Sequence, residues 1–197
     1  MRLGDGRDGV LYVPEGRSQT RPGPLVLALH GAGSNGHDAI QPLRRFADTH
    51  GLVLLAPDAR TGGWDLLDGG FGADVDFIDH ALARAFALCL IDQRSVAIEG
   101  FSDGGSYALS LGLRNTELFT HVIAFSPGFV TLPPCSGKPK VFISHGDDDV
   151  ILPAARCSRR IVSKLNEDGY AVTYREFPGG HLVPAEIAAA AVEWLLQ

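Results

Sequence analysis

The chain has 197 residues, with 17 Lys and Arg against 23 Asp and Glu, which gives a formal net charge of −6. Its composition, 45% hydrophobic and 20% charged, is that of a folded globular protein, and we expect one domain over residues 1–197. The acidic balance argues against a nucleic-acid partner, and no apolar run approaches the roughly 20 residues that a membrane-spanning helix needs. The first residues contain no apolar signal segment, so we expect a cytoplasmic location.

The three cysteines fit a reducing compartment better than a disulfide framework. Cys89 and Cys157 recur with apolar residues at helical spacing, which predicts that both are buried. Cys135 is expected to be a loop thiol, and a Cys135–Cys157 disulfide is the alternative.

Apolar runs of strand length alternate with helical patterns along the chain. Strands are predicted at residues 10–13, 25–29, 52–56, 95–98, 121–125, 140–144 and 172–177. Helices are predicted near residues 38–50, 73–92, 104–115, 153–168 and 184–196. This alternation predicts an α/β fold with a mostly parallel central sheet and helices on both faces.

Polar and reactive residues follow four of the predicted strands, at positions 30–34, 99–105, 145–149 and 178–181. Ligands of such sheets bind outside the carboxyl ends of the strands. We therefore expect the functional site at this edge of the sheet.

The sequence Gly-Phe-Ser-Asp-Gly at residues 100–104 matches the nucleophile-elbow pattern G-x-S-x-G, and it lies between a predicted strand and a predicted helix. Side chains at Gly100 and Gly104 would collide with the neighbouring backbone of so sharp a turn. Ser102 would then face a helix N-terminus, which favours developing negative charge. The pattern predicts that Ser102 is a nucleophile, the alternative being a chance match in a chain with 24 glycines.

A serine hydroxyl is a weak nucleophile and needs a base. Asp147, Asp148 and Asp149 stand downstream and His181 follows them, which is the chain order serine, acid, histidine of α/β-hydrolases. The remaining histidines precede the serine, lie on a helix, or enter or end a strand, and we expect them to be structural: His30, His37, His50, His80, His121 and His145.

Two other sites and one non-catalytic function compete with this interpretation. Gly31, Gly33 and Gly36 with a later Asp58 imitate a dinucleotide-binding fingerprint, although Pro42 interrupts the following helix. A metal site could use His145, Asp147 and Asp149, but no second cluster of ligands accompanies it. An inactive hydrolase fold used for binding would normally lack a triad member, and none is missing here.

The motifs at residues 30–33, 100–105, 145–149 with Pro153, and 180–181 together resemble the phospholipase/carboxylesterase family of small α/β-hydrolases, which includes the acyl-protein thioesterases. The resemblance runs from about residue 25 to the C-terminus. It implies an α/β-hydrolase fold and a Ser102–Asp149–His181 triad. Asp149 is selected because the family's acid follows the glycine by three residues and precedes the proline by four.

The same resemblance implies an oxyanion hole made by the backbone N–H groups of Ala32 and Asp103. Because only its N–H is needed, the Asp103 carboxylate can point away from the developing charge. The thioesterase branch usually has Gln at this position, so the chain looks more like a bacterial esterase branch than like an enzyme for protein thioesters.

The resemblance implies a serine carboxylesterase that acts on small-molecule esters of short to medium chain length, with no metal or cofactor. Thioesterase or lysophospholipase activity on the same triad is the alternative, and the oligomeric state, monomer or dimer, is left open. Residues 126–139 are too few for a helical lid, so we expect an open cleft. Its apolar wall is predicted to include Trp64, Phe129, Ile151 and Leu182.

Overall fold

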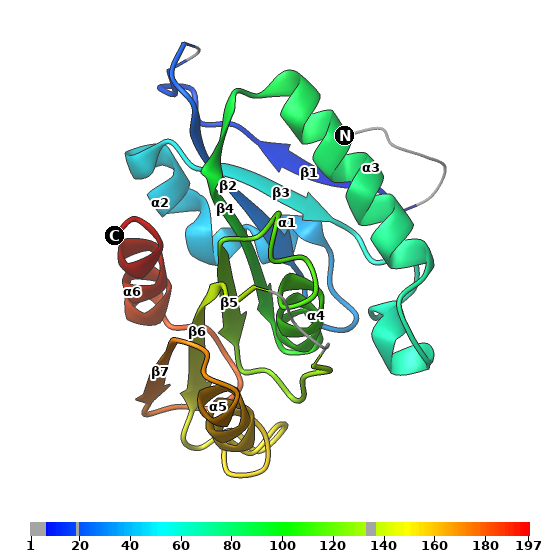
Figure 1. Cartoon of the computed structure of the whole chain (residues 1–197), viewed down its shortest axis with the longest axis vertical. Helices are drawn as coiled ribbons and strands as arrows, with labels where there is room; N and C mark the ends of the chain where they lie inside the picture. The colour runs from blue at the N-terminus through cyan, green and yellow to red at the C-terminus, as the bar shows by residue number, and fades with distance from the viewer. Residues whose placement is uncertain (1–6, 19, 133–136) are drawn as a thin grey trace.

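The computed structural model describes residues 7–18, 20–132 and 137–197, and these form a seven-stranded sheet in the order β1-β3-β2-β4-β5-β6-β7 (Figure 1). The strands are β1 (Gly9–Tyr12), β2 (Gly23–Leu29), β3 (Val53–Pro57), β4 (Ile91–Phe101), β5 (His121–Phe125), β6 (Lys140–Gly146) and β7 (Val172–Phe177). β1 is antiparallel to β3, and every other neighbouring pair is parallel. The predicted mostly parallel sheet is confirmed.

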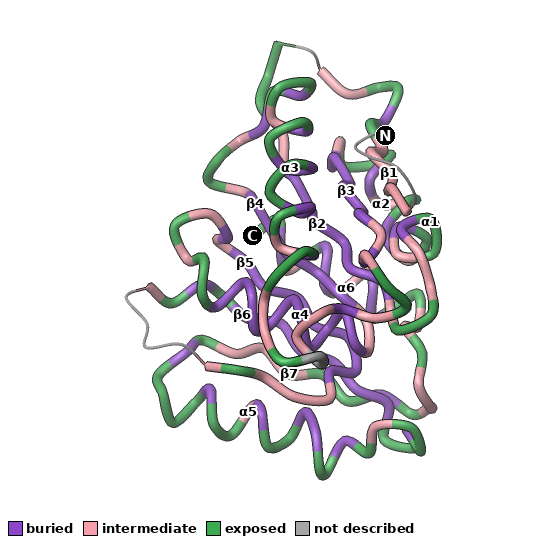
Figure 2. Tube along the Cα trace, turned by 90° about the vertical axis from the view of Figure 1, so that its right-hand side faces the viewer, coloured by how far each residue is buried: buried purple, intermediate pink, exposed green. Residues whose placement is uncertain are grey.

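Helices cover both faces of the sheet, as the sequence predicted. The helical elements are α1 (Gly36–Ala39), α2 (Gln41–His50), the 3₁₀ turn η1 (Asp65–Asp68), α3 (Ala73–Leu88), α4 (Asp103–Gly112), α5 (Ser158–Glu167) and α6 (Ala185–Leu195). Apolar side chains of α3, α4 and α5 pack on one face, and those of α2 and α6 pack on the other. The strands are buried between these two layers, while the outer sides of the helices are exposed (Figure 2).

The central strands are apolar along their whole length because both of their faces are covered. The five residues 25–29 of β2 are each at most 1% exposed, and β3 and β5 are buried throughout. Leu27 faces one core and Ala28 the other, as the alternation of side chains along a strand requires. The sheet is therefore a rigid platform from which the loops at its carboxyl edge project.

Several element boundaries differ from the prediction. The helix predicted over residues 38–50 is divided into α1 and α2, and the helices predicted to end near residues 92 and 115 end at Leu88 and Gly112. β4 begins at Ile91 rather than near residue 95, because residues 92–94 are polar and partly or fully exposed and so break the apolar pattern. The helix predicted from residue 153 begins only at Ser158 and is preceded by a turn at residues 154–157, in which the Pro153 carbonyl accepts from the N–H groups of Arg156 and Cys157.

The segment between β5 and β6 has no helix in its described residues, 126–132 and 137–139, in keeping with the absence of a large lid or cap.

Cys89 and Cys157 are buried free thiols, as expected, and Cys135 lies outside the described residues. Among the helices that the structure describes, none combines the length and apolarity needed to cross a bilayer.

The first turn of α1 packs directly on β3, and this contact provides a test of the fold. A Cβ on Gly36 would lie 2.2 Å from the Ala56 carbonyl oxygen, whereas a Cβ on the exposed Gly16 would meet nothing within 4 Å. Gly36→Ala should therefore cost roughly 2 kcal/mol of unfolding free energy and lower the Tm by about 6 °C. Gly16→Ala should leave the Tm within about 2 °C by the same conversion. Equal melting temperatures for both variants would contradict the close packing of α1.

Candidate active site

Four loops that carry polar residues leave the sheet at the same edge. Leu29 of β2 pairs with Gly100 of β4, and Gly146 of β6 pairs with Phe177 of β7. Because these parallel strands end at similar levels, the residues that follow them converge. The loops after β4, β6 and β7 bring together Ser102, Asp149 and His181.

Ser102 occupies a strained turn between β4 and α4, with φ 57° and ψ −117°. A Cβ on Gly100 would lie 2.1 Å from the Gly104 carbonyl oxygen, and one on Gly104 would lie 2.2 Å from the Leu29 carbonyl oxygen. No side chain fits at either position, so both glycines are required for the turn. The Ser102 N–H donates to the Phe125 carbonyl (2.9 Å), which ties the turn to β5.

His181 lies between the serine and the aspartate. Its Nδ1 is 2.6 Å from Asp149 Oδ2, and its Nε2 is 2.8 Å from Ser102 Oγ. A carboxylate only accepts hydrogen bonds, so Nδ1 carries the proton and Nε2 accepts from the serine hydroxyl. The Phe101 ring packs against the imidazole at a centroid distance of 4.7 Å, which limits the orientations of the imidazole. The serine is thus in direct contact with a base that can remove its proton.

The Asp149 carboxylate is buried but well supplied with donors. Its Oδ1 accepts hydrogen bonds from the N–H groups of Ile151 (2.9 Å) and Leu152 (2.8 Å). Burial by itself raises the pKa of Asp149, but these backbone donors and His181 outweigh that effect and lower the pKa below its ordinary value. Asp149 is therefore held as the anion that can orient and stabilise a charged imidazole.

A second histidine contacts the same carboxylate. His145, fully buried at the end of β6, places Nε2 2.6 Å from the Leu152 carbonyl oxygen and 3.2 Å from Asp149 Oδ2. Burial lowers the pKa of His145 and so favours a neutral ring that donates from Nε2. The sequence predicts a structural role for His145, with a metal ligand as the alternative, and no part in a triad. Its position four residues before Asp149 is the signal that would have linked the two.

The other two aspartates of the run have different surroundings. Asp147 Oδ1 accepts from the Gly179 N–H (3.1 Å), and the Asp148 N–H donates to the Gly179 carbonyl (2.9 Å). A Cβ on Gly146 would lie 2.3 Å from the carbonyl oxygens of both Gly179 and Gly180. These contacts fasten the loop that carries His181 to the loop that carries Asp149.

The described part of the chain offers no cluster of three metal-ligating side chains, and the alternative metal set of His145, Asp147 and Asp149 does not converge on one point. The dinucleotide alternative fails as well, because Asp58 Oδ1 accepts from the Gly36 N–H (2.7 Å) and so caps the first turn of α1. The Asp58 carboxylate therefore binds the backbone of the glycine-rich segment, whereas a dinucleotide site would need it to bind the ribose.

The glycine-rich turn after β2 lies across the cleft from the serine. A Cβ on Gly31 would be 3.5 Å from Ser102 Cβ, and the neighbouring Ala32 is exposed and lines the cleft. His30 holds the turn: Nδ1 donates to the Gly31 carbonyl (2.7 Å), and Nε2 accepts from the Ala59 N–H (2.9 Å). Burial lowers the pKa of His30, which favours this neutral form.

The Asp103 side chain points away from the cleft. Its Oδ2 accepts from the Trp64 N–H (2.9 Å), in the loop before η1. The carboxylate is therefore turned toward a backbone donor, while residue 103 begins helix α4 directly behind Ser102.

Ser102 and His181 open into a cleft of about 710 Å³ between the sheet edge, α1 and the loop before α6. Of the four predicted wall residues, Ile151 and Leu182 line it and are 66% and 49% exposed. The prediction for Trp64 is wrong: the side chain is 1% exposed because its Nε1 donates to the His30 carbonyl (2.9 Å) and its ring packs on Tyr107. Phe129 is not among the lining residues either, since its N–H lies near Ser106 on the α4 side (3.4 Å).

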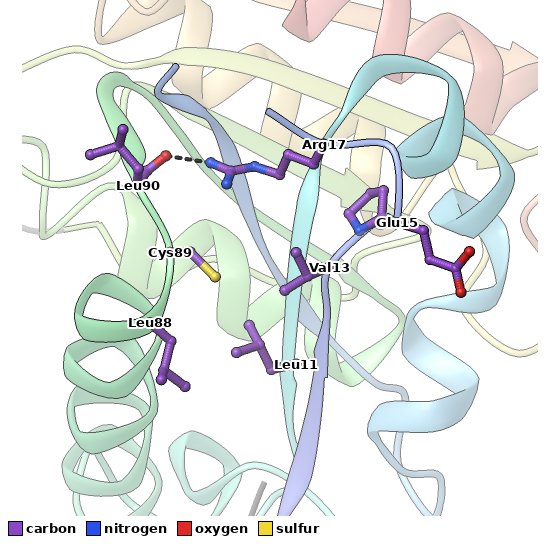
Figure 3. A pocket seen from close by; sticks show the side chains of 8 residues that line it. Leu11, Val13, Glu15, Arg17, Leu88, Cys89 and Leu90 are labelled. Carbon is purple, nitrogen blue, oxygen red and sulfur yellow. Dashed lines mark hydrogen bonds between the residues drawn. The ribbon is translucent and has the colours of Figure 1, made fainter. Parts of the chain in front are cut away.

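A second cavity, of about 640 Å³, lies between the segment after β1 and the end of α3 (Figure 3). Leu11, Val13 and Leu88 line it, and Arg17 donates to the Leu90 carbonyl at its rim. Its one reactive group is the Cys89 thiol, whose pKa is raised by burial and which is therefore a poor nucleophile. The chemistry described above is confined to the other cleft.

A mostly parallel sheet with a serine elbow at the end of a central strand is the architecture of the α/β-hydrolases. Within that class, the family model for phospholipases and carboxylesterases matches residues 74–195, and the chain belongs to this family. The fold expected from the sequence is thereby confirmed.

Individual relatives agree with this assignment. Feruloyl esterase C of Emericella nidulans is 30% identical over 157 residues, which cover 76% of this chain and 57% of that protein. The chain thus spans little more than half the length of that relative. The crystal structure of esterase PE8 is similar with a TM-score of 0.77 and 27% identity, over 96% of this chain and 98% of the other. A phospholipase/carboxylesterase from Dyadobacter fermentans has the same fold, with a TM-score of 0.73 and 22% identity, over 97% and 98% of the two chains.

The contact between Ser102 and His181 predicts covalent reactivity. A fluorophosphonate probe should label the wild-type protein, because the imidazole removes the hydroxyl proton as the oxygen attacks phosphorus. Ser102→Ala should abolish the labelling, whereas Ser34→Ala, at the rim of the same cleft, should retain it. Labelling detected by gel fluorescence in the Ser102→Ala variant would show that another residue is the nucleophile.

Proposed function

We propose that the protein is a serine carboxylesterase that hydrolyses short- to medium-chain carboxylic esters through an acyl-enzyme on Ser102. The observation that carries this proposal is the continuous hydrogen-bonded series from Ser102 Oγ through His181 to the Asp149 carboxylate, which opens into a cleft. Membership of the phospholipase/carboxylesterase family supports the same reaction class.

The proposed reaction begins when Ser102 Oγ attacks the ester carbonyl and His181 Nε2 takes the hydroxyl proton. The imidazolium that forms is stabilised by Asp149, whose two oxygens already accept from the N–H groups of Ile151 and Leu152 and from His181. The backbone N–H groups of Ala32 and Asp103 are proposed to bind the oxyanion of the tetrahedral intermediate, aided by the N-terminus of α4. Because the Asp103 carboxylate is turned toward the Trp64 N–H, its negative charge is directed away from the proposed position of the oxyanion.

The intermediate then collapses, and His181 returns its proton to the departing alcohol. A water molecule attacks the acyl-enzyme by the reverse sequence, with the same histidine as base, and releases the acid and the free serine. Every proton in this scheme moves through His181 Nε2.

Asparagine substitutions separate the three neighbouring aspartates. Asp149→Asn should lower kcat by at least about a hundredfold, because loss of a triad carboxylate leaves the histidine in the wrong tautomer and can cost on the order of 10⁴. Asp147→Asn and Asp148→Asn should each cost less than about tenfold, since neither carboxylate contacts His181. Steady-state kinetics with p-nitrophenyl butyrate, accompanied by thermal melts to exclude unfolding, make the comparison. A large loss in Asp147→Asn or Asp148→Asn with a small one in Asp149→Asn would require the triad to be redrawn.

The relatives named as feruloyl esterases favour a second candidate, an aromatic acyl group of the hydroxycinnamate kind. A cleft of about 710 Å³ is large enough for such a group. The catalytic steps would be the same, and the difference lies only in the acyl group that the cleft accepts.

The open cleft predicts the kinetic behaviour toward lipids. Without a helical cap to displace, activity should follow ordinary saturation and should not rise when a substrate passes its solubility limit. Acetyl to octanoyl p-nitrophenyl esters and methyl ferulate should be better substrates than long-chain triglyceride emulsions. Rates measured across the solubility limit of tributyrin provide the check. A sharp increase at the emulsion interface would mean that another segment acts as a lid.

A further inference from the structure

A glutamate with apolar neighbours across the sheet lies in the wall of the cleft. Glu99 belongs to β4, three residues before Ser102, and it is among the residues that line the cleft. Its neighbours across the sheet are Ala28 on β2 and Ile123 on β5. A carboxyl group in the interior of a central strand is unexpected, because the strand is covered on both faces.

Glu99 is 2% exposed, and its Oε2 has no hydrogen-bond partner among the residues that the structure describes. Desolvation by burial is the one cause that raises its pKa, well above the ordinary value for glutamate. Burial therefore favours the neutral carboxyl group, which can donate one hydrogen bond and accept others.

The contrast with Asp149 is informative. Both carboxyl groups are buried beside the cleft, but Asp149 receives donors from its own loop whereas Glu99 has an oxygen with none. An apolar side chain of similar length would fill the same space without burying an unpaired polar group. A polar group that the protein itself leaves unpaired, in the wall of a substrate cleft, is placed to pair with a ligand.

We infer that Glu99 is a specificity-determining residue that recognises an oxygen atom, as a hydroxyl or an ether, on the part of the substrate that extends from the ester into the cleft. The proposal rests on the proposed esterase function of this site and narrows its substrate class. Ser102 follows Glu99 by three positions, which along an extended strand is a backbone distance of roughly 10 Å. The recognised oxygen therefore lies several atoms away from the ester carbonyl.

The other walls of the cleft fit that assignment. Four apolar side chains also line it and can recognise the remaining length of the substrate group by contact: Ala39, Pro42, Phe101 and Val183. An all-carbon chain of the same size would leave the Glu99 carboxyl unpaired. A chain with an oxygen at the right position would pair with it.

An oxygen scan tests the inference. The first series compares p-nitrophenyl heptanoate with its analogues in which one methylene of the acyl chain is replaced by an ether oxygen, at each position from the fourth to the sixth carbon. The second series places the same replacement in the alcohol group of butyrate esters, and so tells which side of the ester faces Glu99. Rates are corrected for uncatalysed hydrolysis of each ester.

In the wild-type protein, kcat/KM for one oxygen position should exceed that of the all-carbon ester by about tenfold. Glu99→Gln should keep the preference, because an amide also donates and accepts. Glu99→Leu should reduce it to about twofold or less, by slowing the oxygen-containing ester and accelerating the all-carbon one. Glu193→Leu, which removes an exposed glutamate from α6, should retain the wild-type preference.

Two outcomes would overturn the inference. One is a wild-type protein that hydrolyses p-nitrophenyl butyrate but prefers no oxygen position in either series. The other is a Glu99→Leu variant that keeps the preference, which would give Glu99 a structural role alone. If Glu99→Leu does not fold, as judged by thermal melting, the wild-type scan and the Glu99→Gln variant still test whether an oxygen position is preferred.

A failure of the proposed esterase function is distinguishable from a failure of this inference. If the wild-type protein hydrolyses none of the esters, the reaction assignment is wrong. Calorimetric binding of the unreactive N-methyl amides of heptanoic acid and of its ether analogues to the Ser102→Ala variant then tests Glu99 without catalysis. Tighter binding of one ether analogue supports the inference, and equal binding of the whole set overturns it.

Discussion

The site depends on one packing constraint: no side chain fits at Gly100 or at Gly104. β4, the start of α4 and the end of β2 approach so closely there that a Cβ would lie about 2 Å from a carbonyl oxygen at either position. This approach forces Ser102 into the left-handed region and turns its hydroxyl toward the sheet edge. Strain of this kind persists only where the surroundings determine the backbone completely. The buried sheet beneath the turn meets that condition.

A second rigid unit presents the base to that serine. The loops after β6 and β7 are joined by backbone contacts between residues 146–148 and 177–180, and Asp149 and His181 are held at the centre of this unit. Charge-assisted hydrogen bonds to a buried carboxylate are short and strong. His145, at the end of β6, places Nε2 3.2 Å from Asp149 Oδ2, so the sheet as well as the loop surrounds this carboxylate. The imidazole is thereby fixed in orientation before any substrate arrives.

Two carboxyl groups near the cleft have opposite environments, and this difference separates their chemistry. Backbone N–H groups and His181 lower the pKa of Asp149 despite its burial, so it remains an anion. Desolvation raises the pKa of Glu99, so its neutral form is favoured. Environments that push the pKa values of neighbouring acids apart are a common way to assign them different roles. In the proposed function, one acid supports the base and the other offers a neutral hydrogen-bonding group to the cleft.

The sequence by itself determined the order of elements, the parallel sheet and the serine turn, whereas Asp149 was singled out among three adjacent aspartates only through the family resemblance. The elements, the sheet and the turn depend on local patterns: apolar runs, glycines on either side of Ser102, and motifs placed at strand ends. Only the tertiary structure decided that Trp64 is buried against His30, that His145 lies beside Asp149, and that Glu99 lines the cleft and has an oxygen without a partner. Such facts depend on which distant residues become neighbours, and a one-dimensional pattern does not contain the packing that brings them together.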